Sequence, residues 1–322
     1  MAFESVTEQE GVVRRLRAML QGGRLPHAFL FVGSVGTGRL AAARELAHVL
    51  LCSARKRPDE YCGKCADCRL FAAGSHPDYS NTGVPEGKQL VPIESVRGME
   101  RSAALKPVRA GRRVFVMRDA ERISLEAANS FLKTLEEPPG GCVFILIASS
   151  LRRMPETVVS RCRIVRFANM PPDALADRLE ADGLGAEDAQ WLARRAWGSP
   201  GLARQFREAG LHEFNREMVE KLTKLAEAGA FALSDWFLQE AQERSSSGAD
   251  ARIALQELLE CAAAYYRDLA LAAGGPAAGP DAVLDRADLV LETIERIGAN
   301  AQGRLALDRM FVRLARVPEV PA

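Results

Sequence analysis

The chain has 322 residues, of which 48% are hydrophobic and 26% are charged, and its formal net charge is +1. This composition is typical of a folded protein with two or three domains. A nucleic-acid-binding protein that acts alone usually carries a marked positive charge, so any DNA contact must be local or shared with partner chains. No apolar run is long enough to span a membrane, and the N-terminal residues lack the basic start and apolar core of a signal peptide. We therefore expect a cytoplasmic protein.

Helices and strands alternate in the predicted structure of the first half of the chain. The predicted helices are Val6–Leu20, Arg39–Leu51 and Ser124–Glu137. The predicted strands are short and apolar, and they cover Ala28–Val32, Val114–Met117, Val143–Ala148 and Ile164–Phe167. Apolar strands that are separated by helices indicate a parallel sheet that helices cover on both faces. The first half of the chain is therefore predicted to be an α/β module.

The strands end near residue 168, and a short helical region follows. Residues 173–208 predict three short helices, the third of which begins after Gly198. Ser199 can cap the first turn of that helix with its side-chain oxygen, and Pro200 suits the first helical position because no N–H group is needed there. This region is predicted to form a small helical lid.

The remainder of the chain is rich in Ala and Leu and predicts further helices. Breaks between these helices are expected at residues 245–248 and 273–280, where Gly, Ser and Pro gather. The chain thus divides into three predicted parts: an α/β module over 1–168, a helical lid over 169–208 and an all-α C-terminal domain over 209–322.

A glycine-rich segment follows the first predicted strand and opens the next helix, which is the setting of a phosphate-binding loop. Gly33, Gly36 and Gly38 lie in this loop, and Gly33 and Gly38 fit the pattern G-x-x-x-x-G-K-[ST]. Arg39 stands in the lysine position and Leu40 in the hydroxyl position, where a magnesium ligand is required. A tight turn without a ligand is the alternative, and the rest of the chain favours a former nucleotide site.

The strand before Arg118 resembles the Walker B strand of nucleotide hydrolases. Active members end this strand with two acidic residues, one for magnesium and one that orients the attacking water. Here Asp119 is present, but Ala120 occupies the second position and cannot polarise water. Two separate parts of the inferred pocket have therefore lost the chemistry of hydrolysis. We predict that the chain does not hydrolyse ATP, while nucleotide binding stays open.

Four of the seven cysteines form a spaced cluster, C-x9-C-x2-C-x2-C, made of Cys52, Cys62, Cys65 and Cys68. Thiolates at such spacing are good ligands for a tetrahedral zinc ion, and four of them leave no open coordination position. We therefore predict a structural Zn²⁺ site. Reduced surface thiols and an iron–sulfur cluster are the alternatives, and exposed thiols at this density would invite oxidation.

Three features together resemble the AAA+ subunits of bacterial clamp loaders, in particular the delta-prime family. They are the segment Ala128–Pro139 with its sequence Leu-Glu-Glu-Pro-Pro, the Ser160-Arg161-Cys162 motif, and the cysteine cluster placed after the phosphate-loop helix. The resemblance is dense over residues 1–168 and weaker in the lid. In the C-terminal region it depends on size and helical character alone.

The resemblance implies an AAA+ P-loop module, a lid and an all-α collar domain that assembles a ring with gamma/tau and delta subunits. Such a ring opens a sliding clamp and places it on primed DNA during replication. Within this family, degenerate ATP sites mark delta-prime, whereas gamma/tau keeps the catalytic residues. Gly201 also stands where the ATPase subunits place a nucleotide-sensing arginine, and Arg204, one turn later, could substitute only in part.

The Ser160-Arg161-Cys162 motif resembles the arginine finger of these subunits. In that interpretation Arg161 reaches the ATP of a neighbouring subunit and stabilises charge on the transferred phosphoryl group, while Ser160 and Cys162 are its motif neighbours. The simpler interpretation is a surface arginine beside a buried cysteine. The competing functions are an ATP-hydrolysing gamma/tau-type subunit and a stand-alone zinc-dependent DNA-binding module. A P-loop kinase is a further alternative, but it lacks an identifiable acceptor site.

Overall fold

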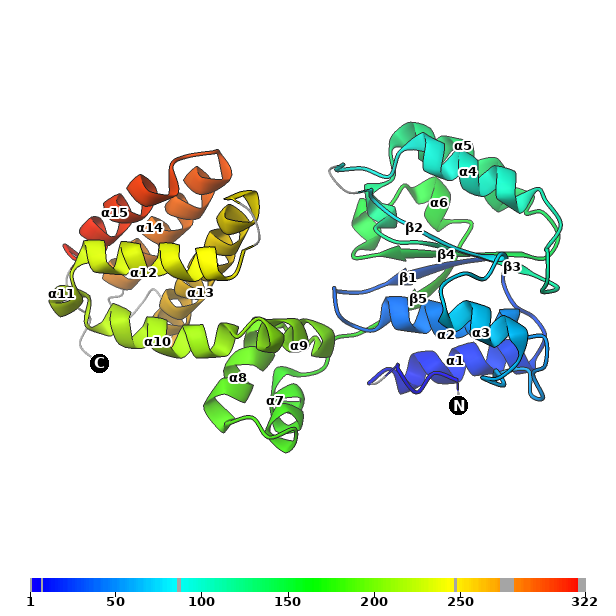
Figure 1. Cartoon of the computed structure of the whole chain (residues 1–322), viewed down its shortest axis with the longest axis horizontal. Helices are drawn as coiled ribbons and strands as arrows, with labels where there is room; N and C mark the ends of the chain where they lie inside the picture. The colour runs from blue at the N-terminus through cyan, green and yellow to red at the C-terminus, as the bar shows by residue number, and fades with distance from the viewer. Residues whose placement is uncertain (1, 7, 86–87, 246–247, 273–280, 318–322) are drawn as a thin grey trace. The chain divides into compact units, whose positions relative to one another are not determined.

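The computed structural model describes residues 2–6, 8–85, 88–245, 248–272 and 281–317 (Figure 1). The chain forms two compact units. The first contains residues 1–182 and 196–202, and the second contains residues 183–195 and 203–322. The stretch 169–208 is thus shared between the two units, and the three-part division of the sequence stays a prediction.

A parallel five-stranded sheet, counted over the described residues, forms the centre of the first unit. Its strands are β1 (Ala28–Val32), β2 (Tyr79–Thr82), β3 (Arg113–Met117), β4 (Cys142–Ala148) and β5 (Arg163–Arg166). The strands lie in the order β2-β3-β4-β1-β5, and every neighbouring pair is parallel. β1, β3 and β4 are buried along their whole length because helices cover both faces. The predicted α/β module, with a parallel sheet covered by helices on both faces, is confirmed.

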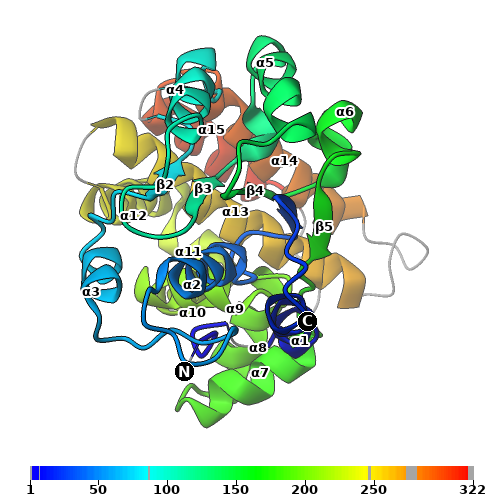
Figure 2. The same ribbon diagram turned by 90° about the vertical axis from the view of Figure 1, so that its right-hand side faces the viewer.

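Helices cover the sheet in two layers, which Figure 1 shows from one side and Figure 2 after a quarter turn. One layer contains α1 (Glu10–Gln21), α2 (Arg39–Leu51) and the short α3 (Ala66–Ala72). The other layer contains α4 (Ile93–Ala103), α5 (Leu125–Glu136) and α6 (Glu156–Val159), and two short 3-10 helices lie at η1 (Ala120–Arg122) and η2 (Leu151–Arg153). The side chains of β1 alternate between the layers: Phe29 and Phe31 join the cluster under α1 and α2, and Leu30 joins the cluster under α5.

The first helix begins later than the sequence predicts. The expected helix starts at Val6, whereas α1 starts at Glu10. Glu8 has a φ angle of 63°, in the left-handed region, so the backbone before Gln9 does not continue the helix. Val6 is nevertheless buried in the core, which is why the apolar pattern extends beyond the helix.

The predicted lid helices are present as α7 (Pro172–Ala181), α8 (Ala186–Arg195) and α9 (Pro200–Glu208). α7 belongs to the first unit and α8 to the second, while residues 200–202 of α9 are counted with the first. The hydroxyl of Ser199 accepts a hydrogen bond from the N–H group of Leu202 at 3.4 Å, and Pro200 is the first residue of the helix. The predicted cap of this helix is confirmed.

Helices make up the rest of the described part of the second unit: α10 (Leu211–Thr223), α11 (Leu225–Ala228), α12 (Ala230–Glu243), α13 (Gly248–Ala272), α14 (Asp281–Gly298) and α15 (Gly303–Leu314). Phe237, Tyr266 and Phe311 are fully buried in their shared core. The all-α prediction is confirmed. The predicted break at 273–280 lies outside the described residues, and so do residues 246–247 of the predicted break at 245–248.

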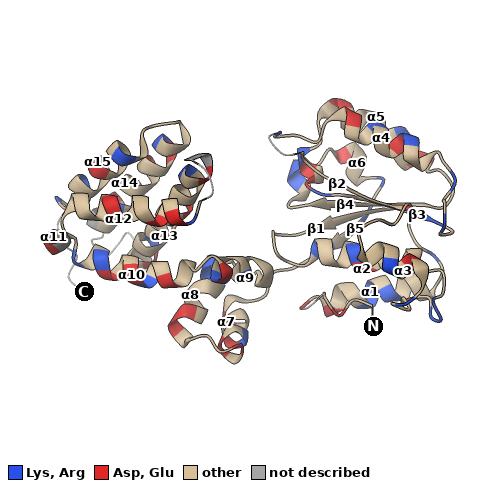
Figure 3. Ribbon diagram, in the orientation of Figure 1, with Lys and Arg blue, Asp and Glu red and all other residues tan. Residues whose placement is uncertain are grey.

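Acidic and basic residues are interspersed along the helices (Figure 3). Several form ion pairs four residues apart on one helix, including Lys221 with Glu217 and Arg296 with Glu292. Such pairs stabilise exposed helices only slightly. Among the described residues, no helix combines the length and the apolar character that crossing a bilayer requires.

Candidate functional site

The glycine-rich segment forms a tight loop between β1 and α2. Gly36 and Gly38 have φ angles of 79° and 86°, which residues with side chains rarely adopt, and Gly38 directly precedes the first turn of α2. The loop is closed by the hydroxyl of Thr37, which donates to the carbonyl of Ser34 at 2.8 Å. The loop thus leads directly into the N-terminus of α2, and its backbone has a shape that suits a phosphate.

The residues that replace the catalytic pair lie in the first turn of α2. Leu40 keeps 37% of its surface exposed and offers no oxygen to a metal ion. Arg39 is half-buried, and this burial lowers its pKa, while the carboxylates of Glu121 and Asp119 act in the opposite direction. Arg39 therefore lies within electrostatic reach of the carboxylates of Glu121 and Asp119.

The acidic residues after β3 are arranged differently from a working pair. Asp119 is exposed and has a φ angle of 51°, and Ala120 is buried in the core. Glu121, which the sequence analysis did not single out, accepts hydrogen bonds from the N–H group of Ser149 at 3.0 Å and from the Ser149 hydroxyl. The sequence signal that could have identified Glu121 is its position, one residue after Ala120. One of its oxygens is therefore already used at the end of β4.

The start of α9 lies directly on the phosphate loop. The hydroxyl of Ser199 donates to the carbonyl of Val35 at 2.7 Å, and the N–H group of Gly201 donates to the carbonyl of Gly36 at 3.0 Å. A Cβ atom on Gly201 would lie 2.6 Å from that carbonyl oxygen and 2.8 Å from the Gly36 Cα. The contact is between two backbones, so position 201 has no room for any side chain, arginine included.

Replacing Gly201 with Ala should lower the thermal unfolding midpoint, because the added methyl group forces these backbones apart. Overpacking of this kind costs about 1–3 kcal/mol. The matched control is Gly11→Ala in α1, where an added Cβ meets no atom within 4 Å. That change should instead leave the midpoint unchanged or raise it slightly, because Gly11 lies in the first turn of α1, where the helix propensity of alanine counts only in part. Equal midpoints for the two variants would show that α9 and the loop separate freely.

The Ser160-Arg161-Cys162 motif follows α6. The guanidinium of Arg161 is half-exposed, and its Nε donates to Glu136 Oε1 at 2.9 Å. Its Nη1 donates to the carbonyl of Thr157 at 2.8 Å and to the hydroxyl of Ser160 at 3.2 Å. Cys162 packs against the core under α5, and burial raises its thiol pKa to about 12. The contact with Glu136, in the Leu-Glu-Glu-Pro-Pro segment, is one that the sequence analysis missed.

The four cysteines come together between α2 and α3. Cys52 caps the end of α2, Cys65 caps the start of α3, and Cys68 lies one turn into α3. All four sulfur atoms lie within 4.8 Å of one another. The Cys52 and Cys65 sulfurs are 3.9 Å apart, and so are those of Cys62 and Cys68. The predicted cluster therefore forms, and it could hold a metal ion.

Two of the sulfur–sulfur separations match a tetrahedral zinc site, and all of them are at most 4.8 Å. With metal–sulfur bonds of about 2.3 Å, the sulfurs of such a site lie about 3.8 Å apart, close to the two separations of 3.9 Å. Backbone N–H groups also point at the sulfurs: that of Cys62 at Cys52 and that of Cys65 at Cys62, both at 3.3 Å. Hydrogen bonds from the N–H groups of Lys64 and Cys65 lower the pKa of Cys62, whereas burial raises the pKa of Cys52 and Cys68.

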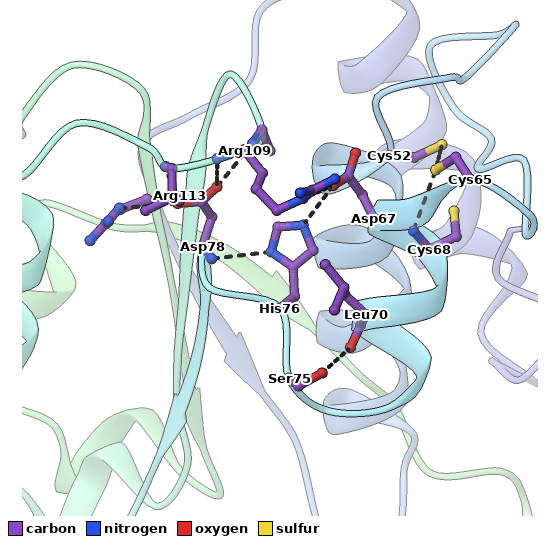
Figure 4. Close-up of polar contacts among 12 residues, drawn as sticks. Cys52, Cys65, Asp67, Cys68, Leu70, Ser75, His76, Asp78, Arg109 and Arg113 are labelled. Carbon is purple, nitrogen blue, oxygen red and sulfur yellow. Dashed lines mark hydrogen bonds and ion pairs between the residues drawn. The ribbon is translucent and has the colours of Figure 1, made fainter.

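A buried polar network fixes the cysteine-bearing helix α3 to the sheet (Figure 4). Asp67, beside Cys68, accepts a hydrogen bond from Arg109 Nε at 2.7 Å and lies 3.7 Å from the ring of the buried His76. Asp78 accepts the N–H groups of residues 108–110, and these bonds hold its pKa below the ordinary value although burial opposes this. The loop before β3 and the cluster are therefore joined through two buried carboxylates.

Comparison with known proteins places this arrangement in a family. Residues 8–171, half of the chain, match the family model described as DNA polymerase III, delta subunit. The chain belongs to this family. It is 34% identical to DNA polymerase III subunit delta' of Pseudomonas aeruginosa over 209 residues, which are 63% of each chain. It is 32% identical to the Escherichia coli delta' subunit over 226 residues, 69% of this chain and 65% of that one.

The chain is also similar to a tau subunit of DNA polymerase III. It is 32% identical to DNA polymerase III subunit tau of Bacillus subtilis over 183 residues, which are 55% of this chain and 31% of that one. The matching part spans less than two-thirds of the length of each of these three relatives. Membership of the DNA polymerase III delta-subunit family thus depends on the match over residues 8–171.

Proposed function

We propose that this chain is the delta-prime-type subunit of a bacterial clamp loader, a AAA+ subunit that does not hydrolyse ATP itself. The observation that carries the proposal is the phosphate loop, where Leu40 replaces the hydroxyl residue. Leu40 cannot bind magnesium, and Ala120 cannot orient a water molecule. The close contact of Gly201 with Gly36 supports the same conclusion, because a sensor arginine does not fit there.

In the proposed complex the chain joins gamma/tau and delta subunits in a ring through its helical C-terminal domain. This ring would open the sliding clamp and place it on primed DNA in the cytoplasm, where bacterial chromosomes are copied. With a net charge of +1 the chain lacks the marked positive charge of a protein that binds DNA alone, so any DNA contact would be shared with the other subunits. The family and the relatives named delta' support this role.

Arg161 is the proposed contribution of this chain to catalysis. We propose that its guanidinium acts on ATP held by an adjacent subunit, where it stabilises charge on the phosphoryl group. The support is its position at the surface on a motif that is anchored by Cys162 in the core. Arg161 is not proposed to act on a nucleotide of its own chain, because the phosphate loop of this chain lacks the lysine and the hydroxyl residue of the P-loop pattern.

We propose that the four-cysteine cluster holds one structural Zn²⁺ ion. When bound, zinc supplies a cross-link between the end of α2 and the start of α3, and no chemistry of reaction. The cysteines occupy all four positions of a tetrahedral ion, so none is left for a substrate. The hydrogen bonds of the buried Asp67 and Asp78 then link the cross-linked segment to the sheet.

The isolated chain should show no ATP hydrolysis above a protein-free blank, and it should co-purify with gamma/tau and delta subunits. A gamma/tau subunit assayed alone is the positive control. Leu40→Thr combined with Ala120→Glu should not restore turnover, because Gly201 still leaves the site without its sensor arginine. Steady hydrolysis by the unmodified chain, at the rate of the gamma/tau control, would instead support the alternative, an ATP-hydrolysing gamma/tau-type subunit.

A further inference from the structure

The guanidinium of Arg161 is held within its own chain on two sides. Nε and Nη2 both donate to Oε1 of Glu136, the last residue of α5. Nη1 donates to the carbonyl of Thr157 and to the hydroxyl of Ser160. Four of the five N–H directions of the side chain are therefore used, and one N–H of Nη2 is left.

Glu136 lies at the C-terminus of a helix, which distinguishes its contact with Arg161 from an ordinary surface ion pair. A carboxylate in the last turn of a helix is electrostatically unfavourable, because the helix C-terminus carries partial negative charge. Glu136 nevertheless lies at the end of α5, with Glu137 directly after it. Leu135, Val158 and Cys162 pack in one hydrophobic cluster, so the backbones that carry Glu136 and Arg161 are held together. Their separation is fixed by the core and not by the ion pair.

Binding a phosphate requires the donors that Glu136 occupies. An arginine grips a phosphate with two parallel N–H groups, and Arg161 has only one unused N–H in the present arrangement. We propose that Glu136 is a positioning residue that holds Arg161 in a resting place, and that the phosphate of a neighbouring subunit must displace it. This inference depends on the proposed role of Arg161 in trans.

Glu136→Gln in the reconstituted loader tests the inference, since it removes the charge and keeps the shape. ATP hydrolysis stimulated by clamp and primed DNA should rise by about two- to five-fold, the factor that corresponds to an exposed ion pair. The matched control is Glu137→Gln, which removes an exposed carboxylate that makes no ion pair among the described residues and should leave the rate unchanged. In an Arg161→Ala background, Glu136→Gln should have no effect.

A second measurement detects the contact between Arg161 and Glu136 without the reconstituted loader. In the isolated chain, the ¹⁵N–¹H signal of Arg161 Nε should shift in Glu136→Gln and stay in place in Glu137→Gln. An unmoved signal, or a loader rate for Glu136→Gln at or below that of the wild type, overturns the inference. If Arg161→Ala alone leaves the rate unchanged, the proposed role of Arg161 fails instead. The two failures are thereby distinguished.

Discussion

Replacing Cys65 with Ser should lower the thermal unfolding midpoint by roughly 10 °C or more, and metal chelation should have the same effect on the wild type. Losing a structural metal is among the few changes that cost more than about 4 kcal/mol, and 1 kcal/mol shifts the midpoint of a domain this size by about 2–4 °C. The segment between α2 and β2 has few apolar anchors of its own. His48 stacks between Tyr61 and Phe71, with ring centroids 3.7 and 4.6 Å apart, and little else is aromatic there.

The control for this prediction is Cys142→Ala, a buried cysteine of β4 that lies outside the cluster. The Cys142→Ala change should lower the free energy of unfolding by about 1 kcal/mol and leave the metal content unchanged. Elemental analysis of protein purified without chelator should give one zinc per chain for the wild type and for Cys142→Ala, and none for Cys65→Ser. Wild-type protein that contains no zinc, with all four thiols reactive in the absence of denaturant, would contradict the proposed site.

The central strands and the helix after the phosphate loop could be predicted because their local patterns are strong. The strand Ala28–Val32 and the helix Arg39–Leu51 are observed with the predicted bounds, and β3 and β4 each extend one residue further. These strands are apolar on both faces because the sheet is covered on both sides. The cysteine spacing likewise predicted the cluster of four thiols, since it concerns a short segment that folds on itself.

Elements without such patterns were missed. β2 has the sequence Tyr-Ser-Asn-Thr and is only partly buried, because it lies at the edge of the sheet and has no apolar run to reveal it. Contacts between distant segments were missed for a different reason. The Ser199 hydroxyl meets Val35 across 164 residues of sequence, and Arg161 meets Glu136 across 25. No local periodicity encodes such pairs, so only the folded chain reveals what surrounds the site.

Arg161→Ala should depress the ATPase activity of the reconstituted loader in the presence of clamp and primed DNA. Arginine fingers elsewhere contribute roughly 10³–10⁵ in rate. The expected loss here is smaller, of several-fold, because the other sites of the proposed ring would keep their own fingers. Folding and ring assembly should be nearly unchanged, since a partly exposed arginine and its ion pair contribute at most about 1 kcal/mol.

The matched control is Arg163→Ala, which removes an exposed arginine two residues further along, in β5. If the effect arose from a general loss of positive charge at this surface, both variants would lower the rate alike. A finger acts through geometry at one atom pair, so only Arg161→Ala should do so. Unaltered stimulated hydrolysis and clamp loading by Arg161→Ala, with ring assembly confirmed by gel filtration, would make Arg161 a surface residue. Its hydrogen bonds to Glu136, Thr157 and Ser160 would then serve only the local fold.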